Sequence, residues 1–351
     1  MAYEIDEAKE LVIKAGKELL KSGLIARTWG NISARISAEQ FVVTPSGRSY
    51  ENLTPEEIVV VNISDCSHEG DVKPSSEKGV HAEGYRLRKD VNFIIHTHQN
   101  NASALSIMGS PITDVSSYGK EYEKILGAVI PCAQYGLSST KKLKKNVSKA
   151  IEDHPDSRAV LMKYHGAVAL GTDYENAFSV ANMLEEVSGM VYERLAGESV
   201  PEVSDLSEYW TLLEDEKMSS YRFLINGSQR AAGVFSSSPY IKKMSGYLKT
   251  MKPYLDDLAQ IAGTSISCVA QDASQKEISD ALKSSMAVMI QGKGALCFGI
   301  NPSEAEAVAM VLEKGAQAAY LANVIGRISP VDPASALLEH KIYVAKYSKL
   351  K

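Results

Sequence analysis

The sequence predicts a mixed α/β or α+β protein, for three reasons. Short β-rich segments and amphipathic helical segments are mixed along the chain without the strict β–α–β order of a doubly wound sheet. No G-x-G-x-x-G motif follows a predicted strand, which argues against a dinucleotide-binding fold. Residues 287–320 repeat the pattern of residues 159–192, which indicates that part of the fold occurs twice.

The elements of the first half are separated by Gly, Pro, Asn and Ser, the residues typical of turns. Helices are predicted where apolar residues recur at helical spacing, and strands where short runs are rich in β-branched residues. The predicted order is a helix over 3–21, β-rich segments at 23–33, 41–44 and 58–61, a helix after Ser76, a strand over 92–98, a helix over 102–108, a strand at 126–130, a helix over 141–152, a strand at 159–162 and a long helix from 174 towards 195.

Composition describes an ordinary globular chain with enough residues for two domains. It has 351 residues, of which 44% are hydrophobic and 23% charged. The net charge of −5 argues against nucleic acid or an anionic membrane as the main partner. No apolar run is long enough to span a bilayer, and the first helix lacks the apolar core of a signal peptide. Four scattered cysteines, without a C-x-x-C pair, are expected to be reduced thiols in a cytoplasmic protein.

We place a domain boundary where the chain turns acidic, between Glu198 and Glu216. The expected organisation is a catalytic domain over 1–197, an acidic linker over 198–235 and a degenerate partial copy over 236–351. In the copy, Lys293 stands where the first domain has His165. The copy also lacks an H-x-H and an S-S-E motif, so we expect no chemistry from it.

Two histidines end the predicted strand over 92–98. Strands have a period of two residues, so His96 and His98 would leave the same face and aim at one point. A catalytic Zn²⁺ takes three protein ligands and keeps one position open, and His165, at the end of another apolar strand, is the best third ligand. The H-x-H pattern alone is equally consistent with a buried structural pair. His81 could lie behind the ligands and orient them.

Glu77, in the first turn of a predicted helix, has three possible roles. It could bind the metal in the substrate-free site, or act as general base when substrate takes the open position. It could also only compensate the helix dipole.

Three loops rich in Gly, Ser and Thr suggest an anion pocket. Such loops offer backbone N–H groups, hydroxyls and an amide, which together can bind a phosphate without a strong cationic residue. Each loop by itself is merely a turn. The residues are Gly30 and Asn31, Ser46 and Gly47, and Ser75 and Ser76.

Five motifs in this order resemble the class II aldolase/adducin family, and most of all the L-fuculose-1-phosphate aldolase-like enzymes. The resemblance covers roughly residues 3–197. The motifs are G-N-I-S (30–33), T-P-S-G (44–47), P-S-S-E (74–77), H-T-H (96–98) and H-G (165–166).

The resemblance implies an α/β/α fold on a mainly antiparallel central sheet, with Zn²⁺ or another divalent transition metal on His96, His98 and His165. It implies that the six Gly, Asn and Ser residues named above hold a substrate phosphate. The implied reaction is reversible aldol cleavage of a ketose 1-phosphate to dihydroxyacetone phosphate and an aldehyde through a zinc-stabilised enediolate. Glu77 would take the C3 proton, and Tyr118 falls near the place of the tyrosine that protonates the aldehyde oxygen.

The family also implies a homo-oligomer with a small sugar phosphate as its partner. We expect the usual tetramer, or a smaller pseudo-symmetric assembly if the C-terminal copy takes the place of a neighbouring subunit. Two sister activities, pentulose-phosphate 4-epimerisation and sugar-phosphate dehydration, use the same groups and stay open. A non-catalytic adducin-like scaffold is disfavoured because all three histidines and Glu77 are present.

Overall fold

The computed structural model describes residues 2–25, 29–226, 230–247 and 249–346, and it divides into two compact units, Met1–Val191 and Tyr192–Lys351. Each unit is built around its own β-sheet. Within the described ranges, no helix is long and apolar enough to cross a membrane.

The first unit contains a seven-stranded sheet in the order β3-β2-β1-β4-β7-β6-β5. Neighbouring strands are antiparallel except β5 and β6, which are parallel, so the expected mainly antiparallel central sheet is confirmed. The strands are β1 (Asn31–Arg35), β2 (Gln40–Val43), β3 (Val59–Asn62), β4 (Phe93–Thr97), β5 (Cys132–Ala133), β6 (Ala159–Met162) and β7 (Gly166–Gly171).

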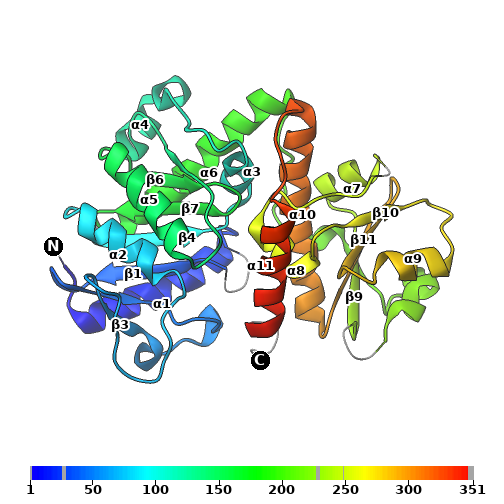
Figure 1. Ribbon diagram of the computed structural model, residues 1–351, viewed down its shortest axis with the longest axis horizontal. Coiled ribbons are helices and arrows are strands. Elements are labelled where there is room, and N and C mark those ends of the chain that lie inside the picture. Colours follow the sequence, from blue (N-terminus) through cyan, green and yellow to red (C-terminus); the bar gives the residue numbers. More distant parts are fainter. Residues whose placement is uncertain (1, 26–28, 227–229, 248, 347–351) are drawn as a thin grey trace. The chain divides into compact units, whose positions relative to one another are not determined.

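Helices cover both faces of this sheet (Figure 1), which gives the expected α/β/α layers. Helices α2 and α5 pack against each other on one face, whereas α3 and α6 lie on the other and α1 packs against β1 and β2. The helices are α1 (Ile5–Lys21), α2 (Lys78–Leu87), α3 (Asn100–Ser106), α4 (Lys120–Leu126), α5 (Lys141–Asp153) and α6 (Tyr174–Ala196), with short 3-10 turns η1 (Tyr50–Asn52), η2 (Pro55–Glu57) and η3 (Val115–Tyr118).

An apolar core between the sheet and helices α2 and α5 fixes the position of α2. Val80 and Tyr85 of α2 and Val147 of α5 are buried in one cluster with Ile94 of β4 and Val168 of β7. Burying a side chain of this size contributes about 1.5–3 kcal/mol, so the cluster holds α2 firmly over β4. The first residues of α2 therefore lie over the strand that carries the two histidines.

One predicted strand of the first unit is wrong. Residues 126–130 were expected to be a strand, but Leu126 is the last residue of α4, and only Ile130 forms a bridge, to Ile112. A short apolar run does not distinguish a strand from the buried end of a helix. The charged and apolar residues from Lys120 onward continue the helix into that run.

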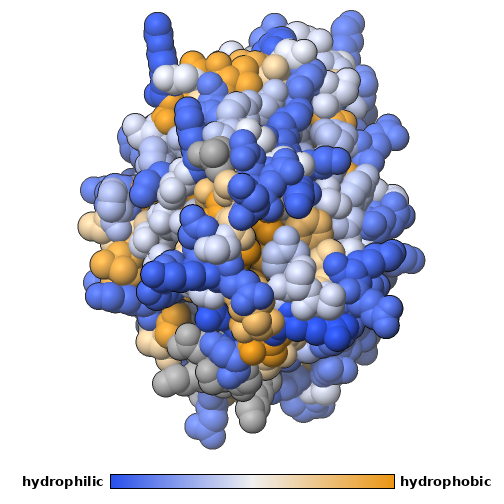
Figure 2. Space-filling model, turned by 90° about the vertical axis from the view of Figure 1, so that its right-hand side faces the viewer, coloured by the Kyte–Doolittle hydropathy of each residue, from blue (hydrophilic) through white to orange (hydrophobic). Residues whose placement is uncertain are grey.

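The second unit contains a five-stranded sheet in the order β10-β11-β12-β9-β8. Its surface in Figure 2 is mostly hydrophilic, with smaller apolar areas between the charged side chains. The elements are η4 (Leu206–Tyr209), β8 (Trp210–Leu212), η5 (Glu216–Leu224), β9 (Ala232–Ser236), α7 (Pro239–Ser245), α8 (Asp256–Ala262), β10 (Ser267–Val269), α9 (Gln275–Ala281), β11 (Ala287–Ile290), β12 (Gly294–Gly299), α10 (Pro302–Ile325) and α11 (Pro333–Lys346).

The second sheet repeats β1-β4-β7-β6-β5 of the first, strand for strand. The register agrees as well: Thr97 of β4 pairs with Ala167, and Ser236 of β9 pairs with Ala295, the residue that matches Ala167 in the sequence repeat. The segment expected to be an acidic linker, 198–235, contributes β8 and most of β9 to this sheet. The repeat therefore includes the strand that corresponds to β4.

The same register assigns residues of the second unit to the positions of the three histidines. Phe235 takes the place of His96, Ser237 that of His98 and Lys293 that of His165. In the described part of the chain, the segment between β8 and β9 holds η5 and no counterpart of β2, β3 or α2. The repeat lacks the element that carries Glu77.

In both units a glutamate on the long helix caps a short helix that comes earlier in the chain. The carboxylate of Glu185 accepts the backbone N–H groups of Asn101 and Ala102 at 2.7 and 3.0 Å. The carboxylate of Glu313 accepts those of Tyr240 and Ile241, both at 2.8 Å, and also the Ser238 hydroxyl at 2.6 Å. These bonds satisfy N–H groups that the first turn of a helix leaves without a partner.

We predict that Glu313→Ala lowers the free energy of unfolding of the second unit by about 2 kcal/mol or more, because it leaves two buried N–H groups without an acceptor. Urea unfolding measures the change. The control is Asn323→Ala, an exposed position of the same helix, which should stay within about 0.5 kcal/mol of the unmodified protein. Equal effects of the two substitutions would contradict the capping role.

Candidate metal centre and anion-binding loops

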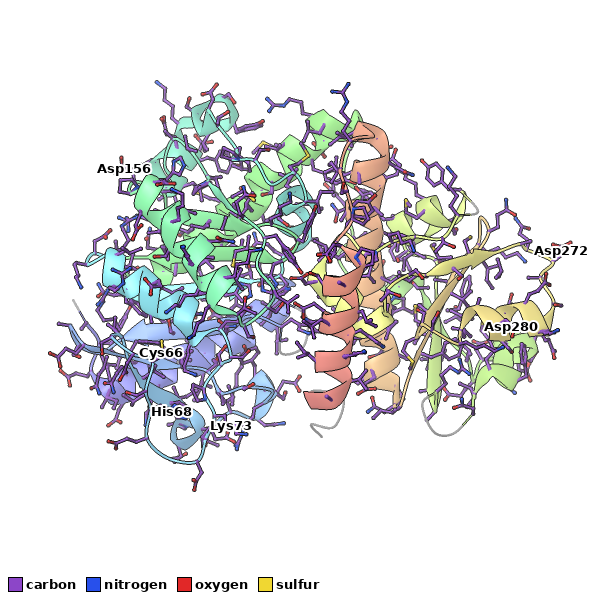
Figure 3. The ribbon with its side chains drawn as sticks, viewed as in Figure 1. Cys66, His68, Lys73, Asp156, Asp272 and Asp280 are labelled. Carbon is purple, nitrogen blue, oxygen red and sulfur yellow. The ribbon has the colours of Figure 1, made fainter. Side chains whose placement is uncertain are left out.

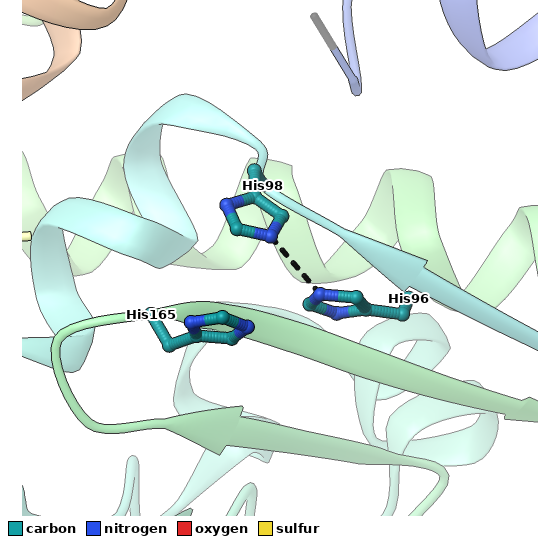
Figure 4. Close-up of side chains that lie close together, drawn as sticks. All are labelled: His96, His98 and His165. Atoms are coloured by element: carbon teal, nitrogen blue, oxygen red, sulfur yellow. Dashed lines mark hydrogen bonds between the residues drawn. The ribbon is translucent and has the colours of Figure 1, made fainter. Parts of the chain in front are cut away.

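Three buried histidines meet at one end of the first sheet. His96 lies near the end of β4, His98 directly after β4, and His165 in the turn between β6 and β7 (Figure 4). One ring nitrogen from each lies within 4.8 Å of the other two. The structure therefore brings together the three residues that the sequence proposed as ligands.

A close approach of two strands places His165 beside the other two histidines. A Cβ atom at Gly166 would lie 2.3 Å from the backbone oxygen of Thr97, so only glycine fits where β7 begins. This contact brings the turn between β6 and β7 against the end of β4. His165 precedes Gly166 and is carried to the cluster by it.

The orientation of His96 is set by a backbone carbonyl. Its Nδ1 lies 2.9 Å from the oxygen of Ala167, an acceptor, so Nδ1 carries the proton. In the neutral ring Nε2 would keep the lone pair that a metal needs, and this atom faces Nε2 of His98 at 3.0 Å. A hydrogen bond from the far nitrogen of a metal-binding imidazole to a carbonyl is a common way to fix its tautomer.

The Glu77 side chain, almost fully buried at the start of α2, is turned towards two of the histidines. Its Oε2 lies 3.1 Å from Nε2 of His96 and its Oε1 lies 3.2 Å from Nε2 of His165. It makes no side-chain cap bond to its own helix, and both of its oxygens face histidine nitrogens instead. Burial raises the pKa of Glu77, but His165 and His96 together lower it well below its usual range.

This donor set fits a divalent transition metal. Imidazole nitrogens with one carboxylate oxygen are ligands that Zn²⁺ and its neighbours in the series accept. Zn–N distances of about 2.0–2.1 Å place two nitrogens of a tetrahedral site about 3.3 Å apart. The 3.0 Å separation of the His96 and His98 nitrogens is close to that value.

The two serine-containing loops of the expected anion pocket are hydrogen-bonded to each other. The backbone N–H of Ser46 donates to the oxygen of Lys73 at 2.9 Å, and the N–H of Ser75 donates to the oxygen of Thr44 at 2.9 Å. These two N–H groups join the loops to each other. Ser46 and Ser75 can offer an anion their hydroxyl groups instead.

The other four residues of the expected pocket lie beside these loops or beside β4. Asn31 of β1 is the ladder partner of His96 and is buried. Gly30 precedes it with a φ of +110°, and a Cβ there would lie 2.6 Å from the oxygen of His96. Gly47 and Ser76 are exposed at the loop surfaces.

A further loop next to the cluster was missed by the sequence analysis. The backbone N–H of Ser139 lies 3.4 Å from Oε1 of Glu77, and its hydroxyl donates to Oγ of Ser76 at 2.8 Å. Oγ of Ser138 lies 3.4 Å from Nδ1 of His165. The serines precede Thr140, which caps α5, so the sequence signals a helix start but not its proximity to Glu77.

The candidate tyrosine lies on a short 3-10 turn. Tyr118 ends η3 and is half-buried, and its catalytic role stays a prediction. His68, which follows Cys66 by two residues and is labelled with it in Figure 3, is exposed and forms an isolated β-bridge with Val61. Among the described residues, the metal-binding cluster contains His96, His98 and His165 alone of the histidines.

Comparison with known sequences identifies the family that has this fold and this group of residues. Residues 10–192 match the model of the class II aldolase and adducin N-terminal domain. The chain belongs to this family.

Two named relatives are aldolases of phosphorylated sugars. The 5-deoxy-D-ribulose 1-phosphate aldolase of Bacillus thuringiensis serovar kurstaki is 34% identical over 191 residues, which cover 54% of this chain and 86% of that protein. The L-fuculose phosphate aldolase of Escherichia coli O6:H1 is 31% identical over 195 residues, covering 55% and 87%. A solved L-fuculose 1-phosphate aldolase is similar with a TM-score of 0.50 and 29% identity, covering 61% of this chain and 93% of that one.

We predict that His165→Ala weakens Zn²⁺ binding by more than about 100-fold. Loss of a residue that only hydrogen-bonds to a metal ligand costs roughly 10–100-fold in affinity, and this substitution removes a proposed ligand itself. Competition with a chromophoric chelator measures the affinity. Lys293→Ala, at the matching position of the second unit, is the control and should leave the affinity unchanged. Tight stoichiometric binding by His165→Ala would show that the cluster is not the metal site.

Proposed function

We propose that the first unit is a divalent-metal-dependent aldolase that reversibly cleaves a ketose 1-phosphate into dihydroxyacetone phosphate and an aldehyde. The observation that carries the proposal is the Glu77 carboxylate, held about 3 Å from the His96 and His165 nitrogens at the edge of the serine loops. A proton acceptor beside a metal and an anion pocket is what an aldol reaction next to a phosphate group needs. The two relatives named for 1-phosphate and fuculose phosphate substrates support the choice of substrate class.

In this proposal His96, His98 and His165 hold the metal, with Zn²⁺ as the first choice for a site of imidazoles. When bound there, the ion supplies Lewis-acid stabilisation of the negative charge that develops on the substrate oxygens. The protein's contribution is the fixed orientation of the imidazoles, which the bond from His96 to Ala167 illustrates.

Glu77 moves the proton at C3. In the cleavage direction the Tyr118 phenolate takes the proton of the C4 hydroxyl, the C3–C4 bond breaks, and the aldehyde leaves with its new carbonyl bond. The electron pair of the broken bond stays on the dihydroxyacetone phosphate fragment, and C3 takes a proton from Glu77, which Glu77 has first received from solvent. Tyr118 returns its proton to solvent, so both groups end as they began. In the condensation direction Glu77, ionised and already facing the cluster, takes that proton back. We assign the exchange of the aldehyde-oxygen proton to Tyr118.

The phosphate is assigned to loops that carry no charged side chain at the contact positions. Hydroxyls, an amide and backbone N–H groups of turns can bind a phosphate by hydrogen bonds alone. The proposed residues are Gly30, Asn31, Ser46, Gly47, Ser75 and Ser76.

We propose that the second unit is a copy without aldolase chemistry. Phe235, Ser237 and Lys293 stand at the three ligand positions, and neither a phenyl ring nor a protonated lysine binds a transition metal. The homo-oligomer stays a prediction, and the mass of the protein in solution tests it.

The test is release of dihydroxyacetone phosphate from a panel of ketose 1-phosphates that includes L-fuculose 1-phosphate and 5-deoxy-D-ribulose 1-phosphate. A coupled dehydrogenase assay detects the product, and the metal content of the same sample is determined. Zinc-loaded protein that cleaves no member of the panel would refute the proposal.

We predict that Glu77→Gln lowers kcat by at least about 100-fold, because the amide cannot accept the C3 proton. The three histidines remain, so the variant should still bind metal. Glu69→Gln is the control and should retain activity, because Glu69 is exposed and precedes the loop that carries Ser75 and Ser76. Full activity of Glu77→Gln would assign the proton transfer to another group.

A further inference from the structure

Four buried polar side chains form a continuous line between β1 and α2 next to the site. Nε2 of His81 contacts Oδ1 of Asn31, and its Nδ1 lies 2.6 Å from Oγ of Ser33. Oγ of Ser33 in turn lies 2.7 Å from the hydroxyl of Tyr85. His81, Ser33 and Tyr85 are each 0% exposed and Asn31 is 7% exposed. We call Asn31, His81, Ser33 and Tyr85 the His81 chain.

The direction of each hydrogen bond in the His81 chain follows from its chemistry. Oδ1 of Asn31 can only accept, so Nε2 of His81 donates to it. Burial, and then the neighbouring His96, lower the pKa of His81 to about 3, so the ring is neutral and carries one proton. Its Nδ1 must therefore accept from the Ser33 hydroxyl, and Ser33 Oγ accepts from the Tyr85 hydroxyl.

This order decides which end of the Asn31 amide is left for a ligand. The carbonyl end is taken by His81, so the NH₂ end, on the other branch of the same carbon, is turned away from His81. Asn31 is the ladder partner of His96 and belongs to the proposed phosphate pocket. An NH₂ group donates to a phosphate oxygen, whereas a carbonyl oxygen would repel it.

We propose that His81 is a positioning residue that locks the Asn31 amide with its NH₂ group available to the substrate phosphate. The proposal rests on the phosphate assignment made under the proposed function. Ser33 and Tyr85 take part by holding His81 in the tautomer that donates from Nε2.

The His81 chain is not needed to attach α2 to β1, because another residue already makes that attachment. Arg35 of β1 donates from Nη2 to the backbone oxygens of Tyr85 and Arg88 at 2.8 and 3.0 Å, and from Nε to the oxygen of Val91 at 2.8 Å. The end of α2 is therefore attached to β1 without His81. A line of four neutral polar groups adds a defined direction of hydrogen bonding, which Arg35 does not supply.

The test measures binding of inorganic phosphate to the metal-loaded protein by calorimetry, beside KM and kcat for the cleaved ketose 1-phosphate. His81→Phe removes the N–H group that donates to Oδ1 of Asn31. We expect phosphate affinity to fall about tenfold, the effect of losing one hydrogen bond to a charged group. KM should rise with little change in kcat. His81→Gln, which restores an N–H group near the position of Nε2, should recover most of the affinity.

A double-substitution cycle separates action through Asn31 from a general effect on the fold. Asn31→Ala should weaken phosphate binding about as much as His81→Phe, and the double variant should bind no more weakly than Asn31→Ala alone. Effects that multiply in the double variant would overturn the proposal. So would a His81→Phe protein with reduced thermal stability and unchanged phosphate affinity.

Ser33→Ala provides the second line of evidence if His81→Phe does not fold. It removes one hydroxyl that is not assigned to the pocket and frees His81 to change its tautomer, so phosphate affinity should fall. Unchanged affinity in Ser33→Ala would overturn the proposal. A parent protein that binds phosphate but releases no dihydroxyacetone phosphate refutes the aldolase activity alone, whereas one that binds no phosphate refutes this inference as well.

Discussion

The site depends on the pairing of β4 with β1 on one side and β7 on the other. This pairing puts Asn31 opposite His96 and brings the turn that carries His165 against the end of β4. The contact is close because Gly166 has no Cβ to meet the backbone oxygen of Thr97. Three segments far apart in the sequence thus reach one point through backbone hydrogen bonds, which do not depend on the identity of the side chains they position.

The sequence predicted the cluster of three histidines well because their spacing is a local property. Two histidines two residues apart on a strand must share a face, and the strand that leads to His165 is an ordinary apolar run. The mainly antiparallel sheet came from the family resemblance, since composition and periodicity alone left α+β and mixed α/β open.

The rest of the site could not be predicted because it is made by long-range contacts. Ser139 reaches Glu77 across 62 residues, and Ser33 reaches His81 across 48 residues. Nothing in either segment signals the other. The hydrogen bonds between the two serine loops, from the N–H groups of Ser46 and Ser75, are also long-range contacts. The false strand at 126–130 had a different cause, the ambiguity of a short apolar run.

Comparison of the two units shows which residues serve the shared fold and which are found only in the first unit. The glutamate that caps a helix is present in both, as Glu185 and Glu313, and so is the strand register. The positions of the three histidines differ completely, with Phe235, Ser237 and Lys293 in the second unit. A carboxylate that caps two helix N–H groups serves the fold in either unit, whereas a metal ligand is needed only where a metal binds.

The cross-bonded loops at 44–47 and 73–76 have a consequence for the energetics of ligand capture. Each loop fixes the backbone of the other before any anion arrives, so their ordering entropy has been lost during folding. A flexible phosphate loop would lose its conformational entropy only when the phosphate binds. That loss would offset part of the binding energy between loop and phosphate. Here the hydrogen bonds to the anion would appear almost fully in the affinity, and the on-rate would not wait for a loop to close.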